Sequence, residues 1–291
     1  MSELTEFAPA KVNLTLAVGA ARADGYHPLE SIVAFTDWGD EVAATPAGEL
    51  TLKLEGAGAA PLRGDPQNLV LKAAFALRAA AERPELGAAL TLTKTLPVAA
   101  GLGGGSADAA AALRLLNRLW DIGFSTRQLA EIGTVVGADV PACVHARPLL
   151  MTGIGDKITP LVAWPALHAV ILNPGVPVST AEVFKAFDDG APAPLPDAKP
   201  PVAGEFETAL ARLSAGRNDL EAPARSIAPA ILAAMDALAA APGARLTRMS
   251  GSGASCFALF EDAGAAGAAA AGLAARHPSW SVRAVLLQGA A

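Results

Sequence analysis

Alternation of apolar and polar residues organises the first half of the chain. It runs from Leu4 to Gly19, and a second apolar run covers residues 31–35. Between the two runs lies a turn that contains Asp24-Gly25. Asp-Gly in such a place is typical of a β-hairpin, because glycine adopts a positive φ without steric cost. The pattern then predicts strands at 50–54 and 89–98, and helices at 68–82, from Ser106 to Trp120 and from Ser125 to Gly137.

The second half of the chain has a pattern that predicts a sheet covered by helices. Strands are expected at 167–172, 245–249, 255–260 and 280–287, and helices at 205–213, 219–240 and 262–275. The proline-rich stretch 190–203 is interpreted as a loop exposed to solvent. The order of the last elements, which is strand, glycine turn, strand, helix and strand, suggests an α+β sandwich with helices on one face. The best domain boundary lies near residue 160, which gives domains 1–160 and 161–291.

Composition and charge exclude several classes of protein. The chain has 291 residues, and 52% of them are hydrophobic against 17% charged, which excludes an intrinsically disordered protein. Lys and Arg number 22 against 28 Asp and Glu, for a net charge of −6. This acidity argues against a nucleic-acid-binding protein, because no excess of cations can release counterions from a phosphate backbone. Any anionic ligand must then be held by local groups.

Cysteines and targeting signals add little. Cys143 and Cys256 are far apart and have no metal-ligand spacing around them, so both are interpreted as buried thiols. The N-terminus carries Glu3 and Glu6 before any basic residue, which is the wrong sign for a secretory signal. No apolar run is credible as a membrane-spanning helix. We therefore expect a cytoplasmic protein without a membrane partner.

The strongest functional signal is a glycine-rich loop between a predicted strand and a predicted helix. Successive glycine N–H groups can converge on an anion because no Cβ blocks the approach, and the helix N-terminus adds about half a positive charge. The loop therefore predicts a phosphate-binding site that uses no lysine, with Ser106 as the helix cap. Its residues are Pro97, Val98, Ala99, Ala100, Gly101, Leu102, Gly103, Gly104, Gly105, Ser106 and Ala107.

Three other interpretations of this loop are possible. A Walker A loop needs a lysine after its last glycine, and Ser106 and Ala107 stand there instead. A dinucleotide-binding loop would use Asp121 as its ribose-binding acid, but Asp121 follows Trp120 at a helix end and does not close a second strand. A purely structural turn is the third possibility, although so many glycines are costly in conformational entropy.

Three further elements accompany the loop. Lys11 stands inside an otherwise apolar strand, and Asp139 stands in the turn after a helix. A second glycine turn covers residues 248–255. Taken singly, these features have ordinary interpretations as a surface lysine, a turn aspartate and a hairpin.

Taken together, the motifs resemble a known family. PAKVNL at 9–14, PVAAGLGGGSADAA at 97–110 and MSGSGAS at 249–255 are similar to the three ordered motifs of the GHMP kinase superfamily. GYHPL at 25–29, GADVP at 137–141 and NPG at 173–175 resemble, more narrowly, the members that act on 4-diphosphocytidyl-2-C-methyl-D-erythritol in the non-mevalonate isoprenoid pathway. The likeness covers nearly the whole chain.

The resemblance implies a fold and an activity. The implied fold is the α+β, two-domain GHMP kinase fold, with an N-terminal domain like ribosomal protein S5 and a ferredoxin-like C-terminal domain. The implied enzyme transfers the γ-phosphoryl group of ATP to the 2-hydroxyl of a cytidine diphosphate conjugate. Phosphoryl transfer requires positioning, charge stabilisation and a group that accepts the hydroxyl proton.

The resemblance also implies roles for individual residues. Asp139 corresponds to the family's catalytic base and Lys11 to its partner, whose ammonium keeps the carboxylate ionised and stabilises the developing alkoxide. The loop 97–107 would bind the phosphates of ATP, and Asn68 would lie near the adenine. The residues that would bind the second substrate are Tyr26 and Phe184 on either side of the cytosine, His27 at the pyrimidine edge, and Asn13 and Thr180 at polar groups.

The sequence supports the base-binding role independently at one position. Tyr26 is the only tyrosine of the chain, and it stands in a turn instead of an apolar run. His27 precedes a proline, which favours an extended backbone that projects both side chains. Stacking a nucleobase on an aromatic ring contributes roughly 1–3 kcal/mol.

Two points stay open at this level. Asp108 stands where members of the family often carry asparagine, and a carboxylate there would repel nucleotide phosphate, so it is left out of the nucleotide site. Mg²⁺ is expected for an ATP-dependent transfer, but no carboxylate cluster identifies its ligands.

The alternative functions are another GHMP kinase acting on homoserine, mevalonate or a sugar, a nucleotide-binding module without catalysis, and a dinucleotide-dependent oxidoreductase. The sequence does not give the oligomeric state.

Overall fold

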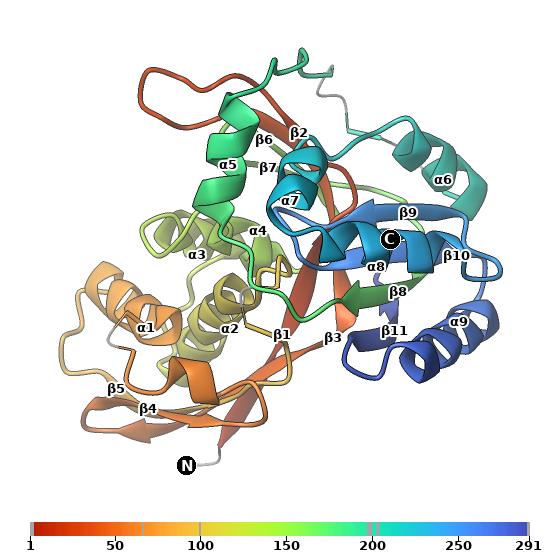
Figure 1. Ribbon diagram of the computed structural model, residues 1–291. Helices are drawn as coiled ribbons and strands as arrows, with labels where there is room; N and C mark the ends of the chain where they lie inside the picture. Colours follow the sequence, from red (N-terminus) through yellow and green to blue (C-terminus); the bar gives the residue numbers. More distant parts are fainter. Residues whose placement is uncertain (1–2, 66, 99, 197–199, 202–203, 290–291) are drawn as a thin grey trace. The chain divides into compact units, whose positions relative to one another are not determined.

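The computed structural model describes residues 3–65, 67–98, 100–196, 200–201 and 204–289 and contains two compact units (Figure 1). Each unit is built from discontinuous segments. The first consists of Met1–Lys11, Trp38–Val98 and Gly103–Ala146, and the second of Val12–Asp37, Ala99–Leu102 and Arg147–Ala291. Two strands, β1 (Leu4–Asn13) and β3 (Leu29–Ala47), contribute residues to both units. A single domain boundary near residue 160 stays a prediction.

The first unit is organised around a parallel strand pair. β4 (Leu50–Glu55) and β5 (Gly87–Thr93) are joined by α1 (Leu69–Ala80), and β5 also pairs antiparallel with the C-terminal part of β3. A short helical turn, η1 (Ala60–Leu62), lies in the same connection. The helix α2 (Gly104–Leu119) packs against α1 and against α4 (Val140–His145), and α3 (Thr126–Gly133) packs against α4. α2 has a run of buried alanines, which lets its neighbours approach closely.

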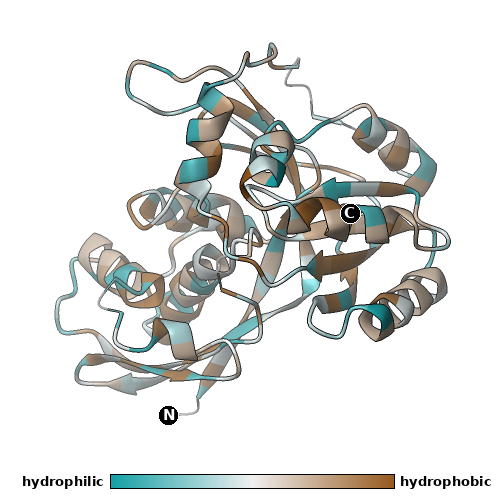
Figure 2. Cartoon of the chain, viewed as in Figure 1, coloured by the Kyte–Doolittle hydropathy of each residue, from teal (hydrophilic) through white to brown (hydrophobic). Residues whose placement is uncertain are grey.

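The second unit contains a four-stranded antiparallel sheet. β8 (Leu167–Asn173), β9 (Leu246–Met249), β10 (Cys256–Phe260) and β11 (Ser281–Leu287) lie in the order β11-β8-β10-β9. Helices connect β8 to β9 and β10 to β11, which makes this the β-α-β-β-α-β pattern of ferredoxin-like folds. β8 and β10 are mostly brown in Figure 2, because they are apolar along nearly their whole length.

One hydrophobic core holds this sheet to its helices. Alternate residues of β8 and β10 share a buried cluster with side chains of α8 (Ala230–Ala239) and α9 (Ala263–Arg276), so both helices cover the same face. The remaining elements of the unit are β2 (Ala17–Val18), β6 (Leu149–Thr152), β7 (Lys157–Pro160), α5 (Thr180–Asp188), α6 (Phe206–Ser214) and α7 (Glu221–Ile227).

Most predicted elements are confirmed. The hairpin forms between β2 and β3, with Gly25 at a φ of 82°. Asn68 begins α1, and its side chain accepts a hydrogen bond from the Val70 N–H. Ser125 caps α3 with a full capping box. The α+β class and the succession strand, strand, helix, strand at the end of the chain are also as predicted.

Several boundaries were predicted wrongly. The helix expected at 219–240 is two helices, α7 and α8. Pro229 lies between them, and it interrupts the helix because it has no N–H to donate and its ring clashes with the preceding turn. The strand expected at 89–98 ends at Thr93, because the next residues turn to bond Asp40. The helix expected from Ser125 to Gly137 ends at Gly133. β3 continues far beyond residue 35, and α4, α5, β6 and β7 were not predicted at all.

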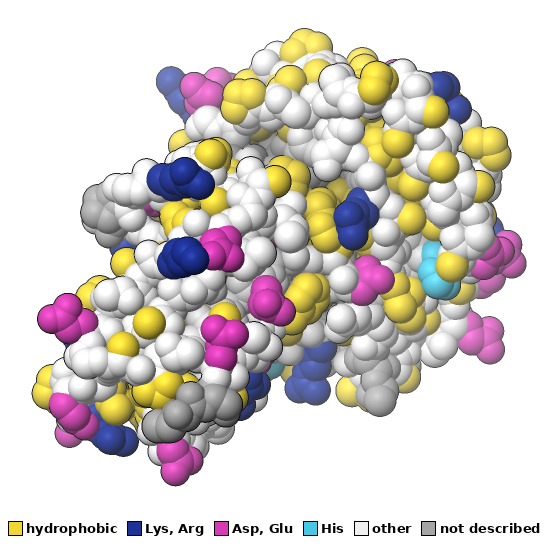
Figure 3. Space-filling view, turned by 90° about the horizontal axis from the view of Figure 1, so that it is seen from below, with side chains coloured by type: hydrophobic (Ala, Val, Ile, Leu, Met, Phe, Trp, Pro, Cys, Tyr) yellow, Lys and Arg dark blue, Asp and Glu magenta, His cyan; other side chains and the backbone are white. Residues whose placement is uncertain are grey.

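No helix of the described residues is long and apolar enough to cross a membrane. On the face drawn in Figure 3, basic side chains lie among acidic and apolar ones.

The close approach of β1 to β3 yields a stability prediction. A Cβ at Gly39 would lie 2.2 Å from the carbonyl oxygen of Ala8, so Gly39→Ala should force the backbones apart and lower the free energy of unfolding by about 1–3 kcal/mol. Gly48→Ala is the matched control, because a Cβ there would meet no atom within 4 Å. Urea denaturation measures both, and equal stabilities of the two variants would contradict the packing described.

Candidate active site

A buried lysine and a partly exposed aspartate form an ion pair in the first unit. The Lys11 side chain is 5% exposed and the Asp139 side chain 40% exposed, and Lys11 Nζ lies 2.9 Å from Asp139 Oδ1. Asp139 directly precedes α4, so the start of a short helix fixes its backbone. The structure thus brings together the two residues predicted to act in catalysis and leaves the carboxylate accessible to a ligand.

The thiol beside this pair is not a competing nucleophile. Cys143 lies on α4 and is buried, as predicted. Burial raises the pKa of its thiol to about 12, so it stays neutral at physiological pH.

The start of α2 is lined by main-chain groups, and it lies against Lys11. Gly103 is the N-cap, with a φ of 62°, and α2 begins at Gly104. The prediction that Ser106 caps the helix is therefore wrong. No side chain caps this end, so the first N–H groups of the helix are available to an anion. A Cβ at Gly103 would lie 3.1 Å from the Lys11 Cβ and Cε atoms, which shows how closely the turn packs on the lysine stem.

The first part of the glycine loop belongs to the second unit and is held by the second glycine turn. The Ser255 N–H donates to the Ala100 carbonyl at 3.1 Å, and the Ser250 hydroxyl donates to the Gly101 carbonyl at 3.1 Å. A Cβ at Gly101 would lie 2.5 Å from the Gly253 carbonyl oxygen, so only glycine fits there. Of the predicted loop residues, Ala99 lies outside the described residues. The turn at 249–255 is thus both a hairpin and a support for the glycine loop.

Sequence reasoning missed a buried cluster of charges beneath the start of α2. Lys94 Nζ lies 2.7 Å from Asp108 Oδ2 and also contacts Asp40, and all three side chains are at most 3% exposed. Asp40 Oδ1 accepts hydrogen bonds from the N–H groups of Thr95 and Leu96. The signals were present, since Lys94 ends an apolar strand and Asp108 interrupts an alanine-rich helix face, but neither indicates its partner.

Burial dominates the chemistry of Asp108. It raises the pKa of the carboxyl group to about 8, with the Lys94 ammonium opposing this effect and the Asp40 carboxylate adding to it. Burial alone would lower the pKa of Lys94, but Asp108 and Asp40 together raise it. The second oxygen of Asp108, Oδ1, has no hydrogen-bond partner among the described residues.

Two of the predicted substrate-binding residues lie against the second glycine turn. The Asn13 N–H donates to the Ser250 hydroxyl at 3.1 Å, and its side-chain amide donates to the Ser31 hydroxyl at 2.8 Å. The Thr180 and Ser252 hydroxyls are hydrogen-bonded at 2.8 Å. The second unit therefore gathers Asn13 and Thr180 around one turn.

Two of the three predicted base-binding residues, His27 and Phe184, pack against each other in the same unit. His27 and Phe184 have ring centroids 4.9 Å apart, and Tyr26 is 57% exposed. His27 Nε2 lies 2.6 Å from Asp188 Oδ1. Because an ionised carboxylate can only accept, Nε2 carries the proton of this bond, and neutral His27 then has Nδ1 as a hydrogen-bond acceptor.

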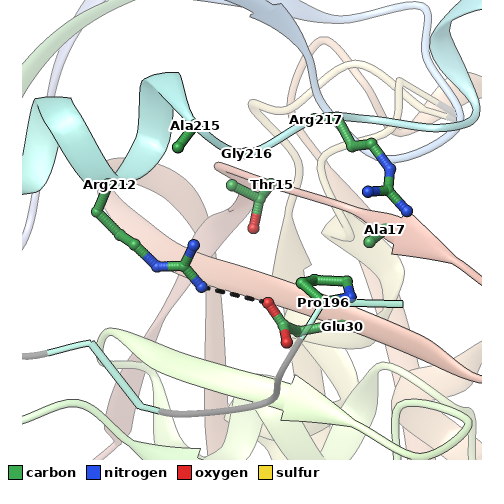
Figure 4. Close-up of a pocket in the computed structure, with 8 residues that line it drawn as sticks. All are labelled: Thr15, Ala17, Glu30, Pro196, Arg212, Ala215, Gly216 and Arg217. Atoms are coloured by element: carbon green, nitrogen blue, oxygen red, sulfur yellow. Dashed lines mark hydrogen bonds and ion pairs between the residues drawn. The ribbon is translucent and has the colours of Figure 1, made fainter. Parts of the chain in front are cut away.

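A pocket elsewhere in the second unit is too small for a nucleotide. It holds about 40 Å³, which suits one or two water molecules, whereas ligand sites are about 300–1,000 Å³. Figure 4 shows Arg212 across from Glu30, with a nitrogen–oxygen distance of 3.4 Å. No predicted site residue lines it. Among the described residues, no group of three or more His, Cys, Asp or Glu side chains could hold a metal ion.

The pKa of Asp108 yields a prediction about stability. Between its ordinary value of 3.8 and about 8, the folded chain keeps the proton that the unfolded chain releases, so the free energy of unfolding falls as the pH rises through this window. Asp108→Asn should remove that dependence and raise the melting temperature relative to the wild type more at about pH 8.5 than at about pH 5. Asp236→Asn, at an exposed site on α8, is the control. A pH-independent difference would contradict the burial of a protonated Asp108.

Comparison with known proteins agrees with this geometry. The chain matches the family models of the GHMP kinases N terminal domain at residues 68–147 and the GHMP kinases C terminal at 202–279. It is 48% identical over 286 residues to a 4-diphosphocytidyl-2-C-methyl-D-erythritol kinase of Methylorubrum extorquens, with 97% of this chain and 98% of the relative covered.

Solved structures give the same result. A crystal structure of 4-(cytidine 5'-diphospho)-2C-methyl-D-erythritol kinase superposes with a TM-score of 0.79 at 32% identity, covering 98% of this chain and all of the other. Homoserine kinase from Cytophaga hutchinsonii superposes with a TM-score of 0.65 at 20% identity, covering 99% of this chain and 95% of the other, which shows a shared fold alone. The chain therefore belongs to the GHMP kinases, within the group of 4-diphosphocytidyl-2-C-methyl-D-erythritol kinases.

Proposed function

We propose that this chain transfers the γ-phosphoryl group of ATP to the 2-hydroxyl of 4-diphosphocytidyl-2-C-methyl-D-erythritol, a step of the non-mevalonate isoprenoid pathway. The observation that supports it most is the Lys11–Asp139 pair, packed against a helix start that is lined by main-chain N–H groups. An accessible carboxylate beside an anion-binding turn is what transfer to an alcohol requires. Relatives with this activity in their names are about half identical to the chain over nearly its full length.

The helix start binds the phosphates in this proposal. The N–H groups at the beginning of α2 and the positive end of the helix dipole attract anionic oxygens. Gly103 allows the turn because its φ of 62° is costly for residues with a Cβ. The loop residues 97–107 surround the phosphates and Asn68 lies near the adenine.

Asp139 accepts the proton of the 2-hydroxyl as that oxygen attacks the γ-phosphorus. The new oxygen–phosphorus bond forms while the bond from the γ-phosphorus to its bridging oxygen breaks, and ADP leaves with the electrons of that bond. Lys11 holds Asp139 in place through their 2.9 Å contact and stabilises the charge that develops on the attacking oxygen. Because the lysine stem packs on Gly103, both groups are fixed relative to the phosphate-binding turn.

Magnesium enters this proposal only with the nucleotide. The ion commonly binds substrate phosphates and keeps several of its waters, and when bound it neutralises phosphate charge. The described residues form no carboxylate cluster for it, so we assign no ligands.

The second unit supplies the groups that recognise the cytidyl substrate. Tyr26 and Phe184 stack on the cytosine, and Asn13 and Thr180 contact polar groups of the substrate. His27 accepts a hydrogen bond from the cytosine amino group through Nδ1, because its Nε2 is bonded to Asp188. We further propose that the enzyme works in the cytoplasm on small molecules, without nucleic acid or membrane, and that residues 1–160 carry the ATP-binding and catalytic groups.

A coupled assay of ADP release tests the activity. The chain should turn over 4-diphosphocytidyl-2-C-methyl-D-erythritol far faster than mevalonate or homoserine, and preferential use of either other acceptor would reject the proposed substrate. Asp139→Asn should lower kcat by about 10²–10⁴-fold, because the carboxylate that takes the proton is lost. Binding of ATP to this variant, measured by calorimetry, should change no more than a few-fold. A wild type that binds ATP but turns over no alcohol would indicate a nucleotide-binding module.

The His27–Asp188 contact predicts base selectivity. Asp188→Ala should raise KM for the cytidyl substrate about 3–10-fold, because a charge-assisted hydrogen bond no longer fixes the ring and its tautomer. The preference for the cytidyl substrate over its uridyl analogue should fall, while KM for ATP stays unchanged. Asp189→Ala is the control, since this neighbouring carboxylate has no contact with His27. An equal effect of both variants would count against the role of Asp188.

A further inference from the structure

Three buried ionisable groups lie directly beneath the start of α2, and the mechanism above uses none of them. Asp40 comes from β3, Lys94 from the residue after β5, and Asp108 from the second turn of α2. A Cβ built on Gly104 would lie 3.5 Å from Lys94 Nζ and 3.8 Å from Asp40 Oδ2. The cluster is thus in van der Waals range of the first residue of the helix, where main-chain N–H groups are available to an anion.

The charges of the cluster do not cancel when all three groups are ionised. One ammonium then faces two carboxylates, which leaves a net charge of −1 in a region almost without solvent. A proton on Asp108 makes the cluster neutral. Both carboxylate oxygens of Asp40 have partners, because Oδ1 accepts main-chain hydrogen bonds while Oδ2 contacts Lys94. Asp108 Oδ2 accepts a hydrogen bond from Lys94, and Asp108 Oδ1 has no hydrogen-bond partner among the described residues.

An anion bound at the helix start changes the equilibrium between protonated and ionised Asp108. Negative phosphate oxygens at this helix start disfavour the ionised form of a carboxylate buried beneath it, since little solvent separates the charges. By linkage, a ligand that favours protonation of a group binds more tightly when that group is protonated.

Resting on the proposed function, we infer that Asp108 is a positioning residue that takes up a proton when the triphosphate of the nucleotide binds at the start of α2. Affinity for the nucleotide therefore falls as the pH rises through the range in which free Asp108 ionises. Burial raises the pKa of Asp108 to about 8, so this range includes slightly alkaline solutions.

The neighbours of Asp108 leave no competing explanation for its titration. Only Lys94 and Asp40 act on its pKa besides burial. Cys143 of α4 is near enough to feel the Asp108 charge, but its own thiol stays neutral. The other charged groups on α2 and on the elements around it are Arg114 and Arg118 of α2, Glu6 and Lys11 of β1, Lys72 and Arg78 of α1, Arg127 and Glu131 of α3, and Asp139 and His145 at the ends of α4.

Isothermal titration calorimetry with the non-hydrolysable nucleotide AMP-PNP and Mg²⁺ tests the inference. Titrations at about pH 8 in two buffers of different ionisation enthalpy give the number of protons taken up. The wild type should take up a fraction of a proton, and its Kd should rise about 3–10-fold between about pH 7 and about pH 9. Asp108→Asn should take up none, and its Kd should be flat and lower than that of the wild type at the higher pH.

A second variant separates Asp108 from the catalytic carboxylate. Asp139→Asn should retain the proton uptake of the wild type, and its loss there would overturn the assignment to Asp108. If the wild type takes up no proton when the nucleotide binds, the inference is also overturned, whether or not the variants are stable. Absence of nucleotide binding at any pH would instead reject the proposed function, so the two failures are distinct.

Discussion

The first unit depends on the close packing of Gly103 on the stem of Lys11. The helix α2 can start there because glycine adopts the positive φ that the turn requires. The absence of a side chain lets the main chain approach a lysine that β1 has already buried. The N–H groups that are available to an anion thus lie next to the ammonium that supports a carboxylate, because the Gly103 backbone packs on the hydrocarbon stem of Lys11.

The same turn explains why an acidic protein can bind a highly charged ligand. Two buried lysines lie next to the helix start, and neither offers excess positive charge, because Lys11 is paired with Asp139 and Lys94 with two carboxylates. In the proposed site, main-chain dipoles supply the attraction instead, and they need no counterion. In the same proposal, the protonation of Asp108 sets how much negative charge lies under those dipoles.

Local patterns predicted the elements well and their interactions poorly. Strands such as β8 and β10 and the caps of α1 and α3 could be inferred because their signals lie within a few residues. The end of β5 could not, because Asp40, which bonds the following backbone, is distant in sequence. Lys11 and Asp139 each had an ordinary interpretation alone, and only the resemblance to a family paired them before the structure placed them in contact. The partner of His27, Asp188, lies on a helix that the pattern did not predict at all.

The position of β11 has a consequence for how the chain reaches this fold. β11 follows every other strand in the sequence, yet it pairs with β8 on one side and with β3 at Thr36 on the other. During synthesis, β8 leaves the ribosome long before β11, the strand that covers one of its edges. Such edges are templates for pairing with foreign strands, and contacts between distant segments form slowly. Until β11 has emerged, this edge of β8 is open to such pairing unless transient structure or a chaperone shields it.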